Sequence, residues 1–257
     1  MEPTSAVQLC LMVNCTITRL EGYKRVIPTR SLAKRSQEQL LKDLYTALPE
    51  EVEIELTDKK KKDIIILATK EHHCLSDLLI RHAFDELQAN ILCVVSNYQT
   101  LEDLTHKFNI PFHFVSHEGK SREAHEAQLL EIIKPYHPEF LVLAKYMRIL
   151  SAEFVTHFSR RIINIHHSFL PAFIGANPYA QAYERGVKII GATAHFVNNN
   201  LDEGPIIAQN VIPVNHTQSA KEMTQAGRDV EKIVLANALR LVFNEQVFVY
   251  RNKTIIF

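Results

Sequence analysis

Three polar side chains in the second half of the chain have the types needed for acyl chemistry. Asn164 and His166 end an apolar segment, and Asp202 lies in a loop after a later apolar segment. A neutral amide can hydrogen-bond a developing oxyanion, and a histidine can transfer a proton near neutral pH. An aspartate beside a histidine stabilises the charged imidazole. Together they predict attack on a carbonyl carbon and protonation of a leaving nitrogen.

The attacking group is expected to be water or a second substrate. Ser168 is close to His166 but lacks the G-x-S-x-G context of a nucleophilic serine, so we interpret it as a loop residue. His167 is interpreted as a structural hydrogen-bonding residue. A zinc site built from His166, His167, His195 and Asp202 is an alternative, but its spacing matches no recognised zinc motif. We therefore expect no metal, and we expect His195 to lie on the sheet.

The segments around these residues alternate between strand and helix patterns. Continuous apolar runs, such as residues 64–67, are typical of strands covered on both faces. The alternation predicts an α/β fold with a Rossmann-like, mostly parallel sheet and flanking helices. Because ligands bind beyond the carboxyl ends of such strands, we expect Asn164, His166 and Asp202 to form one site there.

The expected elements have the following bounds. The strands are predicted at residues 64–67, 91–95, 112–115, 140–144, 162–165, 187–197 and 205–213. The helices are predicted at residues 75–87, 101–108, 121–136, 152–158 and 179–185, with a last one that starts at a capping box at 219–222. The expected buried stripe of the last helix is Met223, Val230, Ile233, Val234 and Leu241. A terminal hairpin is predicted from strands at 247–250 and 254–257.

The first sixty residues have a different pattern. A strand is expected at residues 7–13, a helix at 36–48 after a capping box, and an alternating antiparallel strand at 51–56. The lysine run at 59–62 is interpreted as a solvated linker. The sequence therefore predicts two domains, residues 1–62 and 63–257.

Composition excludes several classes of partner. Lysine and arginine number 29, as do aspartate and glutamate, and this balance argues against nucleic acid as the main partner. The four cysteines form no C-x-x-C pair, which is typical of reduced thiols and a cytoplasmic location. No signal-peptide pattern and no apolar run of spanning length are found, so we expect no membrane partner. Four of the seven glycines, Gly175, Gly186, Gly191 and Gly204, fall between residues 161 and 209, either as turns around a ligand or as ordinary loop turns.

Two loop motifs resemble those of the folate-dependent formyltransferase family. Residues 164–171 read NIHHSFLP and residues 201–205 read LDEGP, matching the family patterns N-x-H-x-S-[LF]-L-P and L-D-x-G-P. The resemblance extends over residues 63–257 and implies the formyltransferase fold, with Asn164, His166 and Asp202 as the catalytic residues. Residues 143–150 resemble the segment that lines the folate head group. The implied substrate-binding residues are Met147, Arg148, Ile149, Leu150, Val197, Asn198, Gly204 and His73.

The loop after the first strand of this domain distinguishes branches of the family. Nucleotide-accepting members need a Gly-rich loop that cradles a phosphate, whereas residues 68–75 read ATKEHHCL, with no glycine and with Glu71, which would repel phosphate. This loop, residues 173–179 and residues 252–257 resemble the deformylase branch. The resemblance implies hydrolysis of 10-formyltetrahydrofolate to tetrahydrofolate and formate, without a cofactor, in support of purine biosynthesis. A transferase with an unrecognised amine acceptor and a folate-binding protein without turnover are the alternatives.

The same resemblance implies an N-terminal ACT domain, a small βαββαβ module. Only about 62 residues precede the catalytic domain, and the usual D-R-x-G turn and first helix are not found after residues 13–15. We therefore expect a small α+β, ACT-like domain that is shortened, and a homo-oligomer to which it contributes contacts.

Overall fold

The computed structural model describes residues 7–12, 16–19, 24–28, 42, 45, 46, 52–56, 60–172 and 178–257. The chain divides into two compact units, Lys61–Phe243 and Met1–Lys60 with Asn244–Phe257. The residues after Phe243 thus group with the N-terminal unit, whereas the predicted catalytic range of 63–257 included them. The predicted helix at 36–48 lies largely outside the described residues, although 42, 45 and 46 are helical. Residues 173–177, including Gly175, also lie outside them.

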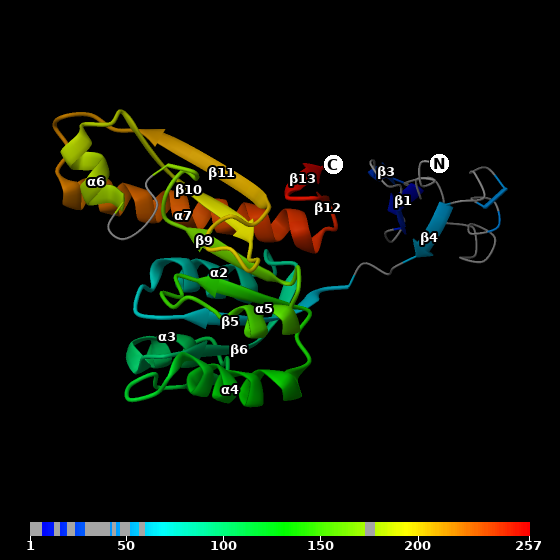
Figure 1. The fold of residues 1–257 in the computed structure, drawn as a ribbon, viewed down its shortest axis with the longest axis horizontal. Helices are drawn as coiled ribbons and strands as arrows, with labels where there is room; N and C mark the ends of the chain where they lie inside the picture. The colour runs from blue at the N-terminus through cyan, green and yellow to red at the C-terminus, as the bar shows by residue number, and fades with distance from the viewer. Residues whose placement is uncertain are drawn as a thin grey trace. The chain divides into compact units, whose positions relative to one another are not determined.

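A seven-stranded sheet forms the centre of the larger unit (Figure 1). Its order is β11-β10-β9-β8-β5-β6-β7. The strands are β5 (Lys62–Ala68), β6 (Ala89–Ser96), β7 (Phe112–Phe114), β8 (Phe140–Ala144), β9 (Ile162–His166), β10 (Ile189–Phe196) and β11 (Ile206–Pro213). β5 to β9 pair in parallel, and β10 is antiparallel to both β9 and β11. The predicted mostly parallel α/β sheet is confirmed.

Helices cover both faces of this sheet because its central strands are apolar throughout. They are α2 (His73–Ala83), α3 (Glu102–His106), α4 (Arg122–Ile133), α5 (Ala152–His157), α6 (Pro178–Arg185) and α7 (Ala220–Phe243), with 3-10 turns at Gln99–Leu101 and Lys134–Tyr136. On one face, Ile65 and Leu67 of β5 pack in a core with residues of α4 and α5. α7 packs against β9, β10, β11 and α2. None of the helices that the structure describes is long and apolar enough to cross a membrane.

The long helix α7 starts where the sequence predicted, but one residue of its predicted buried stripe is exposed. Ser219 and Glu222 form the reciprocal capping box, with the Ser219 N–H donating to Glu222 Oε2 at 2.7 Å. Four of the five predicted stripe residues are buried. Ile233 is 56% exposed instead, and Glu231, at 1% exposed, is buried. The prediction for Ile233 was wrong because helical geometry places it to one side of the line formed by the four buried stripe residues.

The smaller unit contains a four-stranded sheet of order β2-β4-β1-β3. Its strands are β1 (Val7–Met12), β2 (Thr16–Arg19), β3 (Lys24–Pro28) and β4 (Val52–Leu56). β4 pairs antiparallel with β2, as the alternating pattern predicted, and β1 pairs in parallel with β3. The predicted hairpin is present as β12 (Val247–Tyr250) and β13 (Lys253–Ile256). The ACT-like assignment stays a prediction.

Candidate active site

Three polar side chains of the candidate site, Asn164, His166 and His195, lie on one face of the sheet. Asn164 and His166 are two residues apart on β9, so both point to the same face. His195 of β10 lies directly opposite Asn164 in the antiparallel register, which places its ring on that face as well. Strand geometry alone therefore gathers an amide and two imidazoles.

The loop at residues 197–205, between β10 and β11, brings a carboxylate to this face. We expected Asp202 to follow a parallel strand, and this was wrong, because β10 is antiparallel. The loop instead folds back over the face, with Asp202 at a φ of 57°. Gly204 permits this path, because a Cβ on it would lie 1.7 Å from the backbone oxygen of Phe196. Gly204 therefore shapes the loop that presents Asp202.

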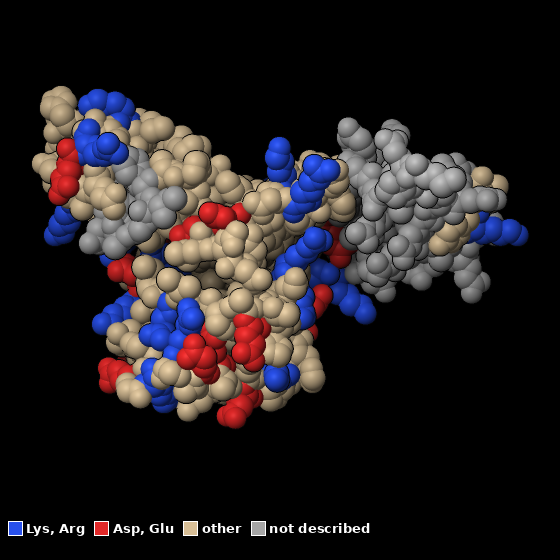
Figure 2. Space-filling model, in the orientation of Figure 1, with Lys and Arg blue, Asp and Glu red and all other residues tan. Residues whose placement is uncertain are grey.

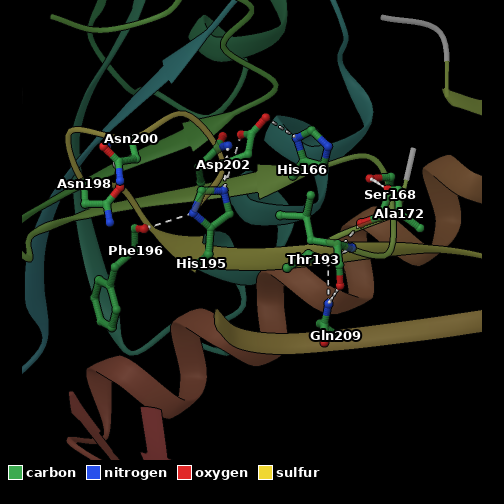
Figure 3. A network of polar contacts seen from close by, with 12 residues as sticks. His166, Ser168, Ala172, Thr193, His195, Phe196, Asn198, Asn200, Asp202 and Gln209 are labelled. Carbon is green, nitrogen blue, oxygen red and sulfur yellow. Dashed lines mark hydrogen bonds and ion pairs between the residues drawn. The ribbon is translucent and has the colours of Figure 1, made fainter. Parts of the chain in front are cut away.

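Asp202 lies between the two imidazoles (Figure 3). Its Oδ2 is 3.3 Å from His166 Nδ1, and its Oδ1 is 3.7 Å from His195 Nε2. Burial opposes the charge, but hydrogen bonds from His166 and His195 outweigh it and hold the pKa of Asp202 well below its usual range. Asp202 is therefore a carboxylate anion at neutral pH and a poor base.

Hydrogen bonds orient both rings. His195 Nδ1 donates to the backbone oxygen of Phe196 at 2.9 Å, so its Nε2 faces the Asn164 amide nitrogen at 3.3 Å and Asp202 Oδ1 at 3.7 Å. His166 directs an Nδ1–H at Asp202, and its buried Nε2 has no hydrogen-bond partner in the part of the chain that the structure describes. A buried ring nitrogen without a protein partner is satisfied by water or by a bound ligand. His166 Nε2 is therefore available to a substrate.

A cavity of about 540 Å³ opens in front of these groups. Six of the eight predicted substrate-binding residues line it together with Asn164, His166 and Asp202, namely Met147, Arg148, Ile149, Leu150, Val197 and Asn198. Met147 and Ile149 are each 57% exposed and offer apolar surface to a flat ring. The other two are not among the residues that line this cavity. Gly204 is buried within the 197–205 loop, and His73 lines a neighbouring cavity.

Hydrogen bonds from other elements hold the 145–150 segment. The Met147 N–H donates to Thr69 Oγ1 at 3.0 Å, which ties the segment to the loop after β5. At its far end, the buried Glu126 of α4 accepts from the Ser151 N–H at 2.8 Å and from the Ser151 hydroxyl. The segment is thus anchored on both sides of its apolar rim.

A second hydrogen-bond network holds the loop after β9, as Figure 3 shows. Ser168 Oγ donates to the backbone oxygen of Ala172 at 2.8 Å, which agrees with its interpretation as a loop residue. The Thr193 hydroxyl donates to the Ser168 oxygen at 2.9 Å and accepts from Gln209 Nε2 at 2.9 Å. These contacts fix the direction in which the chain leaves His166.

His167 stacks on His166, with ring centroids 5.1 Å apart. Burial, with the charges of Lys145 and His166, lowers the pKa of His167 to about 4. A ring with this pKa is neutral at physiological pH. His167 therefore adds no positive charge beside the His166 imidazole.

The geometry gives no support to the zinc alternative. Among residues 60–172 and 178–257, the side chains whose ligand atoms all lie within 4.8 Å of one another are His73, Cys74 and Glu231. Burial and the charge of Glu231 raise the pKa of the Cys74 thiol far above its usual range, so its ligating thiolate is disfavoured. Lys145 Nζ already lies 3.2 Å from Glu231 Oε2. This group behaves as an ion pair.

Sequence reasoning missed the roles of His195, Lys145 and Glu231. His195 orients the Asn164 amide, but only the β9–β10 register reveals this contact. Lys145 lines both cavities, directly after β8. A lysine immediately after a buried parallel strand was the one signal available for it.

The fold and site define an α/β enzyme with an amide, an imidazole and a carboxylate at one cavity. A sequence model of the formyl transferase family (Formyl_trans_N) matches residues 62–239. The formyltetrahydrofolate deformylase of Haemophilus influenzae is 56% identical over 217 residues, covering 84% of this chain and 78% of the relative. The same enzyme of Escherichia coli K12 is 58% identical with the same coverage.

Solved structures agree with these relatives. A formyltetrahydrofolate deformylase from Pseudomonas syringae has a TM-score of 0.80 at 41% identity, covering 87% of this chain and 76% of that chain. A glycinamide ribonucleotide transformylase from Symbiobacterium toebii has a TM-score of 0.73 at 28% identity, covering 76% of this chain and 94% of that chain. The chain belongs to the formyltetrahydrofolate deformylase family.

Proposed function

We propose that the protein hydrolyses 10-formyltetrahydrofolate to tetrahydrofolate and formate. The observation that carries the proposal is His166, which lines the cavity, is held by Asp202 at Nδ1, and has a buried Nε2 without a hydrogen-bond partner among the described residues. Such an imidazole can take a proton from a nucleophile and return it to a leaving group. Relatives that are 56% and 58% identical carry the deformylase name.

The cavity suggests how the substrate binds. The pterin lies against the apolar rim of Met147 and Ile149, and the formyl group reaches toward Asn164 and His166. The Asn164 amide N–H that does not bond His195 donates to the formyl oxygen and stabilises the oxyanion as it forms. The amide does not titrate, so this contribution is independent of pH.

Proton transfer follows from the pKa of the site carboxylate. His166 Nε2 removes a proton from water as the water oxygen bonds to the formyl carbon. The resulting imidazolium is stabilised by Asp202, whose low pKa makes it a counter-ion rather than the base. His166 then protonates N10 as the C–N bond breaks, which releases tetrahydrofolate and formic acid, and the formic acid loses its proton to water to give formate. The proton taken from water thus leaves on the folate nitrogen.

The proposed reaction also implies a role in one-carbon metabolism. Formate release and a balanced one-carbon folate pool would serve purine biosynthesis in the cytoplasm. Figure 2 shows basic and acidic side chains interspersed over the face it presents, which fits a small-molecule substrate better than nucleic acid. The ACT-like segment would contribute contacts in a homo-oligomer.

Formate release from 10-formyltetrahydrofolate without an added acceptor tests the function. His166→Ala should lower kcat by about 10²–10⁴-fold, the usual contribution of general acid–base catalysis, and leave folate binding intact. His106→Ala, at an exposed position on α3, is the matched control and should keep full turnover. Near-normal turnover of His166→Ala would refute the assignment. Faster formyl transfer to an added amine than to water would favour a transferase.

A further inference from the structure

A second cavity adjoins the catalytic centre. It has a volume of about 280 Å³, and Lys145, Met147 and His167 line both this cavity and the larger one. Its other lining residues come from the loop after β5, from the start of α2, from α6 and from α7, namely Glu71, His73, Tyr179, Ala180, Thr224, Arg228 and Glu231. It is smaller and more charged than the cavity with the apolar rim. We call it the co-substrate cavity, since a polar acceptor would approach the formyl carbon from here.

The deeper part of the co-substrate cavity is a charged cluster around Glu231. Its carboxylate accepts from Tyr179 Oη at 2.6 Å, lies 2.8 Å from His73 Nε2 and 3.2 Å from Lys145 Nζ. Burial disfavours its charge, but the hydrogen bond from His73 and the charge of Lys145 lower the pKa of Glu231 to about 2. Glu231 is therefore an anion at neutral pH, and the charge of Lys145 is compensated within the protein.

The outer part of the cavity has a second compensated pair. Arg228 Nη2 lies 2.7 Å from Glu71 Oε2, and the two side chains are 32% and 38% exposed. Both cations that line the cavity are thus paired with a carboxylate. The buried His73 Nδ1 has no hydrogen-bond partner among the residues described and lies 3.6 Å from Glu71. A water molecule can satisfy such a nitrogen, whereas an anion there would meet two carboxylates.

We propose that the paired charges of the co-substrate cavity select water over a phosphorylated amine as the formyl acceptor. The inference rests on the proposed hydrolysis. Transferases named for glycinamide ribonucleotide share this fold at 28% identity, so the fold itself is compatible with such an acceptor. In this chain, Arg228 is ion-paired with Glu71, and Lys145 is ion-paired with Glu231. A phosphate would have to displace a carboxylate from each cation and then remain beside it.

Glu71→Gln tests the proposal, with inorganic phosphate as the probe in calorimetric titration of the full chain. The variant removes the negative charge paired with Arg228, so phosphate affinity should rise at least about tenfold over wild type. Glu71→Ala should behave alike and serves if the glutamine variant folds poorly. Asp229→Asn is the matched control. It removes a carboxylate 2.7 Å from Lys232 on the same helix, outside both cavities, and should leave phosphate affinity unchanged.

The same proteins are then supplied with 10-formyltetrahydrofolate and glycinamide ribonucleotide. Wild type should release formate and tetrahydrofolate in equal amounts and form no formylated amine. Two results would overturn the proposal: wild type binding phosphate as tightly as Glu71→Gln, or wild type formylating the amine. A wild type that releases no formate with or without the amine would refute the proposed hydrolysis. The phosphate titration would still decide whether the cavity excludes anions.

Discussion

Gly204→Ala should impair catalysis although it replaces no side chain of the active site. The added Cβ would lie 1.7 Å from the Phe196 oxygen, whereas real Cβ contacts essentially never fall below 3.0 Å. The loop or the strand must therefore move by at least about 1.3 Å. The clashing atom is backbone, and it also accepts the hydrogen bond that orients His195, so no side-chain rotation relieves it.

The expected cost follows from that displacement. A catalytic group misplaced by about 1 Å can lower the rate by about 10²-fold, so kcat for formate release should fall by about that factor as Asp202 moves from His166. Overpacking should cost about 1–3 kcal/mol of unfolding free energy. Both are measurable, by steady-state kinetics and by urea unfolding followed by circular dichroism.

Gly191→Ala is the matched control on the same hairpin. Its Cβ would lie 2.4 Å from the Asn210 oxygen, another backbone clash between β10 and β11, but away from Asp202. We expect a similar loss of stability with kcat within about threefold of wild type. If Gly204→Ala also keeps kcat within threefold, the close approach does not position Asp202, and the reasoning is wrong.

Two further predictions concern groups that support the site. Thr69→Val removes the acceptor of the Met147 N–H and should raise KM about tenfold, consistent with about 1–1.5 kcal/mol for a lost hydrogen bond, while Thr69→Ser retains wild-type KM. An unchanged KM in Thr69→Val would show that contacts other than this hydrogen bond hold the 145–150 segment. The folded pKa of Glu231, about 2, is below its ordinary 4.5, so its ionisation contributes stability that is present above pH 4.5 and lost as the pH falls toward 2. Glu231→Gln should lose about 3–5 kcal/mol at pH 7 and show a flatter decline of unfolding free energy in acid, whereas parallel profiles would contradict this.

Local patterns predict most of the scaffold because burial and capping are local. The apolar run at residues 140–144 has the same bounds as β8, since a strand covered on both faces is apolar at each position. The capping box at Ser219 and Glu222 fixes the start of α7 with two reciprocal hydrogen bonds. In both cases the residues that decide the structure lie within one turn or one strand.

Strand direction and register do not follow from such patterns. The alternation of strands and helices predicted a mostly parallel sheet but not which strand departs from it, and β10 follows α6 and still runs antiparallel to β9. The pairing of His195 with Asn164, and the return of the 197–205 loop over the face, depend on this direction. Asn164, His166 and Asp202 were assigned by resemblance, whereas the supporting role of His195 required the register.

Glu231 shows why the chemistry of the co-substrate cavity is harder to predict than its scaffold. The buried stripe was predicted from side-chain polarity, so the prediction included Ile233 and did not include Glu231. The groups that make burial of this carboxylate favourable lie far away along the chain, with His73 158 residues and Tyr179 52 residues distant. A buried carboxylate without them would be protonated or would destabilise the fold. We propose that the charge balance of this cavity selects water, and that balance exists only in the assembled fold. In the sequence, the loop after β5 indicates only the outer ion pair, through Glu71.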